Sequence, residues 1–205
     1  MANDVLGNQF VNMGSVPAYT EATRLGNGWN TQMATPLAPL VAAPTTTAAL
    51  TIYNNSNGSG SNILVIDELY AMETTGIITS TEGYGLWAQV SKPAAATVGT
   101  VTALSIYSSS GRAPYTGIAG SRVITTINTA TATIANGWRP WGDSPIAWEA
   151  VQAAVPGYSW SVNIRGRLIV PPMCSLDLHI VGSVASTVRF IAGATWYELP
   201  LRNTP

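Results

Sequence analysis

The amino-acid sequence predicts an all-β fold: an eight-stranded antiparallel sandwich, jelly-roll-like, with an extended N-terminal arm. Two observations predict it. From residue 46 onward, segments of alternating apolar and polar residues are separated by clusters of Gly, Asn, Ser and Pro, which is the pattern of strands joined by turns. These segments are also rich in Thr, whose β-branched side chain suits a pleated strand.

The first 45 residues form the predicted arm, because they contain four prolines and show little periodicity. A disordered tail is poor in large apolar residues, whereas this segment contains many. We therefore expect the arm to pack on its own domain, residues 46–205, or on a neighbouring subunit. The predicted interface anchors are Phe10, Tyr19, Trp29 and Met33.

Two of the eight expected strands contain an internal glycine. Gly166 predicts a bulge within its strand, and Gly193 interrupts the last strand. One helix is expected over Ser144–Ala154, with Ser144 as its N-cap and Pro145 as its first residue. The expected strands are Ala48–Tyr53, Asn62–Met72, Gly83–Val90, Thr100–Tyr107, Ser121–Asn128 with Thr131–Ile134 as one strand or hairpin, Tyr158–Val170, Leu176–Val181 and Thr187–Leu199.

Alternation places one face of each strand against a core, so two sheets are expected to stack. Eight strands in two sheets is the number found in a jelly roll. An immunoglobulin-like sandwich and a small barrel remain alternatives, because the number of strands does not fix their order.

Charged residues make up 9% of the chain and hydrophobic residues 46%. A soluble domain usually contains about 25% charged residues, so little electrostatic repulsion keeps copies of this chain apart. This composition favours a subunit that shares its surface with neighbours. The alternative is a small β protein that is merely rich in Thr.

The net charge of −1 excludes a basic surface of the kind that binds nucleic acid through several phosphate contacts. Arg165 and Arg167 are the closest pair of cations, and their spacing places both on one face of a strand. An exposed or interface strand face explains them better than a nucleic-acid site. We expect no direct contact with nucleic acid.

The residues that could perform catalysis are few. Cys174 and His179 are five residues apart, so a strand places them on opposite faces. One Cys and one His are too few for a zinc site, and the acidic residues are scattered. A carboxylate pair from distant strands would make a hydrolase, which we rank third among the functions. We expect no enzyme, no catalytic residue, no metal and no cofactor.

The tryptophans are the most unusual feature of the sequence. Trp138, Trp141 and Trp148 lie close together, with Arg139 placed to stack on one of them. Aromatic residues on a loop could stack on sugar rings, anchor a subunit interface or cover their own core. The sequence leaves these three readings open.

Three features stand out in the C-terminal third: a strand that ends at Val170-Pro171-Pro172, an alternating run that ends at Val181-Gly182, and a final Trp196-Tyr197-Glu198. In these features the chain resembles the closing strands of β-sandwich structural proteins of tailed bacteriophages. It covers about the last 45 residues and the strand pattern before them. The resemblance implies a decoration or cement protein of a capsid, often a trimer, and no site residues.

The expected function is therefore that of a virion protein that decorates or stabilises a phage capsid as a homotrimer bound to a major capsid protein. The alternative is a carbohydrate- or receptor-binding module of a phage fibre or tail. No signal peptide and no membrane-spanning stretch are visible, so we expect synthesis in the host cytoplasm and no membrane association.

Overall fold

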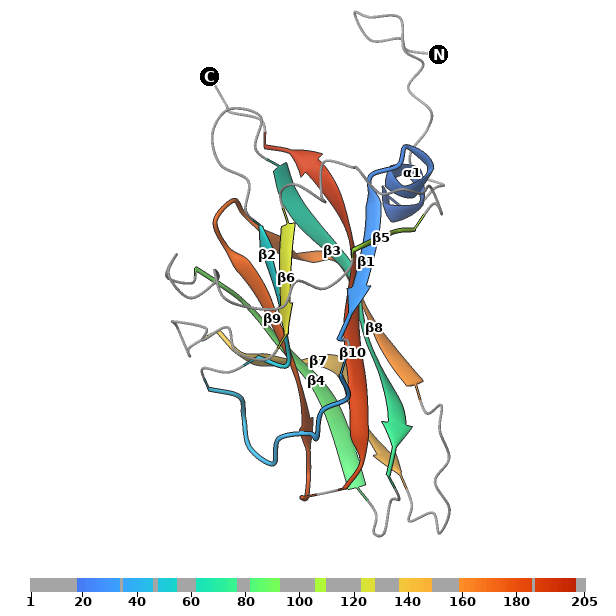
Figure 1. Cartoon of the computed structure of the whole chain (residues 1–205), viewed down its shortest axis with the longest axis vertical. Helices are drawn as coiled ribbons and strands as arrows, with labels where there is room; N and C mark the ends of the chain where they lie inside the picture. The colour runs from blue at the N-terminus through green and yellow to red at the C-terminus, as the bar shows by residue number, and fades with distance from the viewer. Residues whose placement is uncertain are drawn as a thin grey trace, which may run out of the picture.

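The structure is a computed structural model. It describes residues 18–33, 35–45, 48–54, 62–76, 82–92, 106–109, 123–127, 137–148, 159–185 and 187–201. These residues form one short helix, α1 (Ala18–Arg24), and ten strands arranged in two sheets that pack face to face (Figure 1). The predicted all-β sandwich is confirmed.

Each sheet contains five strands, and every pairing is antiparallel. The order in sheet 1 is β5 (Tyr107–Ser108), β1 (Gly28–Gln32), β10 (Arg189–Pro200), β3 (Asn62–Thr75) and β8 (Ser159–Val170). The order in sheet 2 is β6 (Val123–Ile127), β2 (Leu50–Asn54), β9 (Ser175–Gly182), β4 (Glu82–Ser91) and β7 (Arg139–Trp148).

The strand order is that of a jelly roll with two additions. Without β5 and β6, eight strands remain, and the chain crosses between the sheets at every connection except the one from β4 to β7. This arrangement is the eight-stranded jelly roll. The two additional strands come from the segment between β4 and β7, and they extend the sheets beside β1 and β2.

The described strands agree with the sequence pattern except in two places, while residues 100–105 of the strand expected over Thr100–Tyr107, and all of Thr131–Ile134, lie outside the described residues. The helix expected over Ser144–Ala154 is wrong: residues 139–148 form β7, in which Ile146 pairs with Tyr84 and Trp148 with Glu82. The segment lacks an apolar stripe at helical spacing, whereas pairing with β4 satisfies its backbone groups. Residues 149–154 lie outside the described part of the chain.

The second difference concerns the segment expected to form an arm. Its residues 28–32 form β1, which pairs with β10, and α1 lies beside this strand (Figure 1). Trp29 and Met33 are 3% and 1% exposed and belong to the core of their own chain. The sandwich therefore begins before residue 46, because Trp29 and Met33 bury their apolar surface between the sheets.

The core lies between the inner faces of the two sheets, where Trp196, Tyr84 and Phe190 are the largest fully buried side chains. The glycine expected to interrupt the last strand has a packing role. A Cβ atom at Gly193 would lie 2.3 Å from Cζ of Tyr70, whose hydroxyl donates a hydrogen bond to the carbonyl oxygen of Thr31. Glycine at this position lets the Tyr70 ring cross β10 and reach β1.

Candidate functional site

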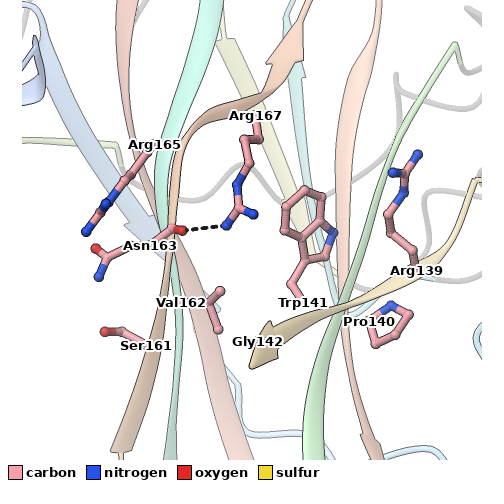
Figure 2. A pocket seen from close by; sticks show the side chains of 9 residues that line it. All are labelled: Arg139, Pro140, Trp141, Gly142, Ser161, Val162, Asn163, Arg165 and Arg167. Carbon is pink, nitrogen blue, oxygen red and sulfur yellow. Dashed lines mark hydrogen bonds between the residues drawn. The ribbon is translucent and has the colours of Figure 1, made fainter. Parts of the chain in front are cut away.

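A groove opens on the side of the sandwich where β7 and β8 are the edge strands of their sheets (Figure 2). Its volume is about 850 Å³. We call it the arginine groove and define it by its nine lining residues: Arg139, Pro140, Trp141, Gly142, Ser161, Val162, Asn163, Arg165 and Arg167. The described residues that line it include three arginines and no acidic residue.

A bulge in β8 creates one wall of the groove. The pairing with β3 runs from Leu168 opposite Ile66 to Asn163 opposite Glu68, so four residues of β8 face one residue of β3. Arg165 and Gly166 adopt left-handed conformations there, with φ of 51° and 76°. The bulge predicted at Gly166 is therefore confirmed. Bulges of this kind commonly occur beside binding sites, where they redirect side chains.

A second bulge, in β7, forms the opposite wall. In the pairing with β4, Trp141 is opposite Leu86 and Ile146 is opposite Tyr84, so four residues of β7 face Gly85 alone. Gly142, which lines the groove, has a φ of 122° that favours glycine. The two edge strands thus depart from regular pairing at the groove that they share.

Arg167 joins the two walls. Its Nε atom donates a hydrogen bond to the carbonyl oxygen of Ile164, at 3.1 Å, and its Nη2 atom donates one to the carbonyl oxygen of Asn163, at 3.0 Å (the latter drawn in Figure 2). These bonds hold the β8 bulge in place. Its guanidinium carbon lies 5.3 Å from the centre of the Trp141 ring, a cation–π contact across the groove. Arg139, which the sequence suggested as the stacking partner of a tryptophan, does not make this contact.

Arg139 and Arg165 have different surroundings from Arg167. Both side chains are exposed, and neither forms a salt bridge within the described residues. Asp67, opposite the β8 bulge, is the acidic group that interacts with Arg165, whose positive charge lowers the pKa of the Asp67 carboxyl against the larger raising effect of burial. The groove therefore presents two cationic side chains with unused donor capacity.

Because of the β8 bulge, Arg165 and Arg167 do not lie on one strand face, contrary to the prediction from their spacing in the sequence. Figure 2 shows the Arg167 side chain directed towards Trp141 and the Arg165 side chain directed away from it, alongside Asn163. The sequence predicted that both would lie on one regular strand face. Ser161 and Asn163, which add a hydroxyl and an amide to the groove, have no sequence signal that marks them.

The structure does not bring the three predicted tryptophans into one site. Trp141 is half-buried, lines the groove and packs against the core. Trp138 donates a hydrogen bond from Nε1 to the carbonyl oxygen of Thr45, 2.7 Å away, and so ties β7 to the segment that follows β1. Trp148 lies at the far end of β7, opposite Glu82. Of the described side chains, Trp141 lines the groove and Trp138 does not.

The predicted interface anchors are also separated. Phe10 lies outside the described residues, and Trp29 and Met33 are in the core. Tyr19 lies on α1, where its hydroxyl and that of Ser109 form a hydrogen bond of 2.6 Å and its ring lies 6.4 Å from the ring of Tyr197. These contacts hold α1 against sheet 1 of the same chain.

A second polar group of residues lies on the outer face of sheet 2 and is closed. The Asp177 carboxylate, 1% exposed, accepts hydrogen bonds from four side chains of β2, β4 and β9. We call these residues the Asp177 cluster: Thr51, Gln89, Ser91, Ser175 and Asp177. The backbone N–H of Gly137 donates to Gln89 Oε1 and covers the cluster. Burial raises the pKa of the Asp177 carboxyl, although the four hydrogen bonds act to lower it.

Cys174 and His179 have different local environments. The backbone N–H of Ile180 donates to Nδ1 of His179, and burial lowers the pKa of this imidazole, which favours its neutral form. Burial raises the pKa of the Cys174 thiol, which disfavours the thiolate that a nucleophile requires. No hydrogen bond joins the Cys174 and His179 side chains in the described part of the chain.

The two carboxylates that interact within the core region are Glu73 and Glu82. Both are buried, and Glu82 together with burial raises the pKa of Glu73. Tyr84 donates its hydroxyl hydrogen bond to Glu82. Neither acid lines the arginine groove.

No group of three or more His, Cys, Asp and Glu side chains that could hold a metal ion occurs among the described residues. The described helix is too short to span a membrane. Comparisons with models of protein families, with curated proteins and with solved structures found no match to this chain.

Proposed function

We propose that this chain is a non-enzymatic structural protein of a virus particle. In this proposal it decorates or stabilises a phage capsid, binds copies of itself as a homotrimer and contacts a major capsid protein. The observation that carries the proposal is an apolar patch on the outer face of sheet 1.

The apolar patch spans the neighbouring strands β10, β3 and β8. Leu199 is opposite Ile63, and Ile169 is opposite Val65, so these side chains share one face of the sheet. Leu199 and Ile169 are 42% and 46% exposed, and Leu201, just beyond β10, is 43% exposed. A face that exposes several large apolar side chains in one place is typical of a protein–protein contact.

Two further features support an assembly. The chain has few charges to oppose association of its copies, and burial of apolar surface contributes about 25 cal/mol for each Å² removed from water. The jelly roll is also a common fold of viral capsid proteins, although lectin domains share it. Fold alone does not establish function, so the patch is the feature to test.

The test is the mass of the purified protein in solution, measured by sedimentation equilibrium. We expect an oligomer for the unchanged chain and a shift to the monomer for Leu199→Asp, because a buried, unpaired charge opposes association. Val184→Asp is the matched control, since Val184 is 39% exposed and lies beyond β9, at the other end of β10. A monomeric unchanged protein, or an oligomer that Leu199→Asp leaves intact, contradicts the proposal.

A second candidate function, a carbohydrate- or receptor-binding module, is favoured by the arginine groove. Trp141, one of the aromatic residues expected to contact a ligand, lies in this groove beside polar side chains. The groove volume of about 850 Å³ falls in the range of small-molecule sites, about 300–1,000 Å³. Screening of the full chain on a glycan array tests this function, and the absence of any glycan signal contradicts it.

A further inference from the structure

The arginine groove concentrates positive charge in a protein that has very little charge. Three of the eight arginines of the chain line it, while the net charge of the whole chain is −1. No acidic side chain lines the groove in the described part of the structure. Asp67, which interacts with Arg165, does not line the groove, so an anion that enters the groove meets little competing negative charge from the described lining residues.

The three arginines have different roles: Arg167 stabilises the fold, whereas Arg139 and Arg165 are available to a ligand. Arg167 is committed to the chain itself through two backbone carbonyls and the Trp141 ring. Arg139 and Arg165 remain exposed and form no salt bridge with described residues. Arg165 also sits at a φ of 51°, a conformation that costs a non-glycine residue about 1 kcal/mol or more. Strain of this kind gathers at binding sites, where it presents a side chain to a ligand.

We infer that the arginine groove binds an acidic saccharide, and that Arg139 and Arg165, on opposite walls of the groove, bind separate carboxylates of it. This inference rests on the second proposed function and names its ligand class. A guanidinium offers a planar pair of donors that matches a carboxylate, and the resulting charge-assisted hydrogen bonds are stronger than those between neutral groups. Ser161 and Asn163 supply the neutral donors and acceptors that sugar hydroxyls require.

The shape of the groove argues against an acidic peptide. A peptide that binds at a sheet edge adds a strand and needs an uninterrupted row of backbone groups. Both edge strands here contain a bulge. Residues 142–145 of β7 lack a regular pairing with β4, and residues 164–167 of β8 lack a regular pairing with β3. Such bulges prevent strand addition. Nucleic acid is also a poor fit, because Arg139 and Arg165 alone provide too few phosphate contacts for useful affinity.

The groove also supplies apolar surface of the kind that sugar rings contact. Trp141 and Pro140 lie together on the β7 wall (Figure 2). Arg167 already covers part of the Trp141 ring, so stacking on this ring alone does not explain binding. The arginines therefore contribute the selectivity, and the ring contributes a non-polar wall.

The experiment measures binding of trigalacturonic acid to the full chain by isothermal titration calorimetry. Its fully methyl-esterified form is the matched ligand, because it keeps the hydroxyls and ring faces and removes the charges. We expect the acid to bind, the ester to bind about tenfold more weakly or worse, and added salt to weaken binding of the acid. A hexaglutamate peptide is the third probe and should not bind.

Three variants locate the site. Arg139→Gln and Arg165→Gln should each reduce affinity for the acid about tenfold and leave affinity for the ester unchanged. Arg189→Gln is the control, because Arg189 is an exposed arginine at the start of β10, outside the groove, and its loss changes the net charge equally. Circular dichroism of each variant confirms that the fold is retained.

The outcomes separate this inference from the function on which it rests. If the acid and the ester bind equally, or if Arg139→Gln and Arg165→Gln bind the acid as the unchanged chain does, the acidic ligand class is wrong while saccharide binding survives. If hexaglutamate binds and neither saccharide does, the partner is an acidic protein segment, and both the inference and the second function are overturned. If none of the three probes binds, the inference is overturned.

Discussion

The Asp177 cluster and the arginine groove are both polar, yet they differ in every property that separates a structural site from a binding site. In the cluster, one carboxylate that is 1% exposed accepts four hydrogen bonds from three strands of one sheet. In the groove, Arg139 and Arg165 are exposed at the edges of two different sheets and have no salt bridge among the described residues.

This difference shows that hydrogen-bond satisfaction distinguishes a structural polar site from a binding site better than polarity does. A buried acid whose acceptors are all used has no capacity for a ligand, and its contacts join β2, β9 and β4. Exposed cations on two bulged edge strands contribute little to folding and retain their capacity for a ligand. Substitutions should therefore affect stability in the cluster and binding in the groove.

The largest expected effect follows from Asp177→Ala. The substitution removes the acceptor of four buried donors, and each donor left without a partner costs about 1–3 kcal/mol, partly recovered where hydroxyls reorient. We expect a loss of about 3 kcal/mol in the free energy of unfolding, measured by urea denaturation. Glu68→Ala, which changes a half-buried acid on β3, is the control and should cost less than about 1 kcal/mol. Equal losses for the two variants would show that the cluster is not a stabilising unit.

The same cluster should make stability depend on pH. Burial raises the pKa of Asp177 in the folded protein above the ordinary value of about 4, so the folded state binds this proton more tightly than the unfolded state. Its stabilising contribution is full below about pH 4 and is lost as pH rises through the raised pKa. The stability of the unchanged protein relative to Asp177→Asn should therefore fall from pH 4 to pH 8 in urea titrations. A difference that grows with pH would show that the hydrogen bonds outweigh burial.

Arg167→Ala should have an intermediate effect, because Arg167 is the groove residue that serves the fold. The change removes two hydrogen bonds to backbone carbonyls and the contact with Trp141. We expect the free energy of unfolding, measured by thermal denaturation, to fall by about 1–2 kcal/mol, and the tryptophan fluorescence to change. A loss below about 0.5 kcal/mol would mean that the β8 bulge does not depend on this side chain.

The smallest effect on stability is expected for Arg139→Gln. Arg139 is exposed and makes no salt bridge in the described residues, so the free energy of unfolding should change by no more than about 0.5 kcal/mol. Urea denaturation beside Arg167→Ala provides the direct comparison. A loss as large as that of Arg167→Ala would show that both arginines are structural and would remove the contrast between the two regions.

Much of the fold could be predicted from local pattern. Alternation of apolar residues locates β3, β4, β8, β9 and β10 within a few residues of their observed bounds, because a strand with one buried face must alternate. Gly166 marks its bulge for a similarly local reason, since φ of 76° favours glycine. The eight alternating segments suggested a jelly roll, and the strand order shows that topology with two strands added.

Other features depend on contacts between distant segments, and the sequence pattern misled there. Residues 28–33 were predicted to belong to the arm because the first 45 residues contain four prolines and little periodicity, yet β10 supplies a pairing partner about 165 residues away from β1. The segment from Ser144 read as a helix because its capping residues suit one, yet β4 pairs with it as a strand.

Most of the candidate site also depends on contacts between segments that are distant in the sequence. Sequence marked Trp141 and the pair Arg165 and Arg167, but it placed the arginines on one face and gave Ser161 and Asn163 no role. The residue types, the strand alternation and the scarcity of charge follow from sequence. The groove itself exists because two edge strands from different sheets bulge at the same level, and register against a partner strand is a property of the folded chain alone.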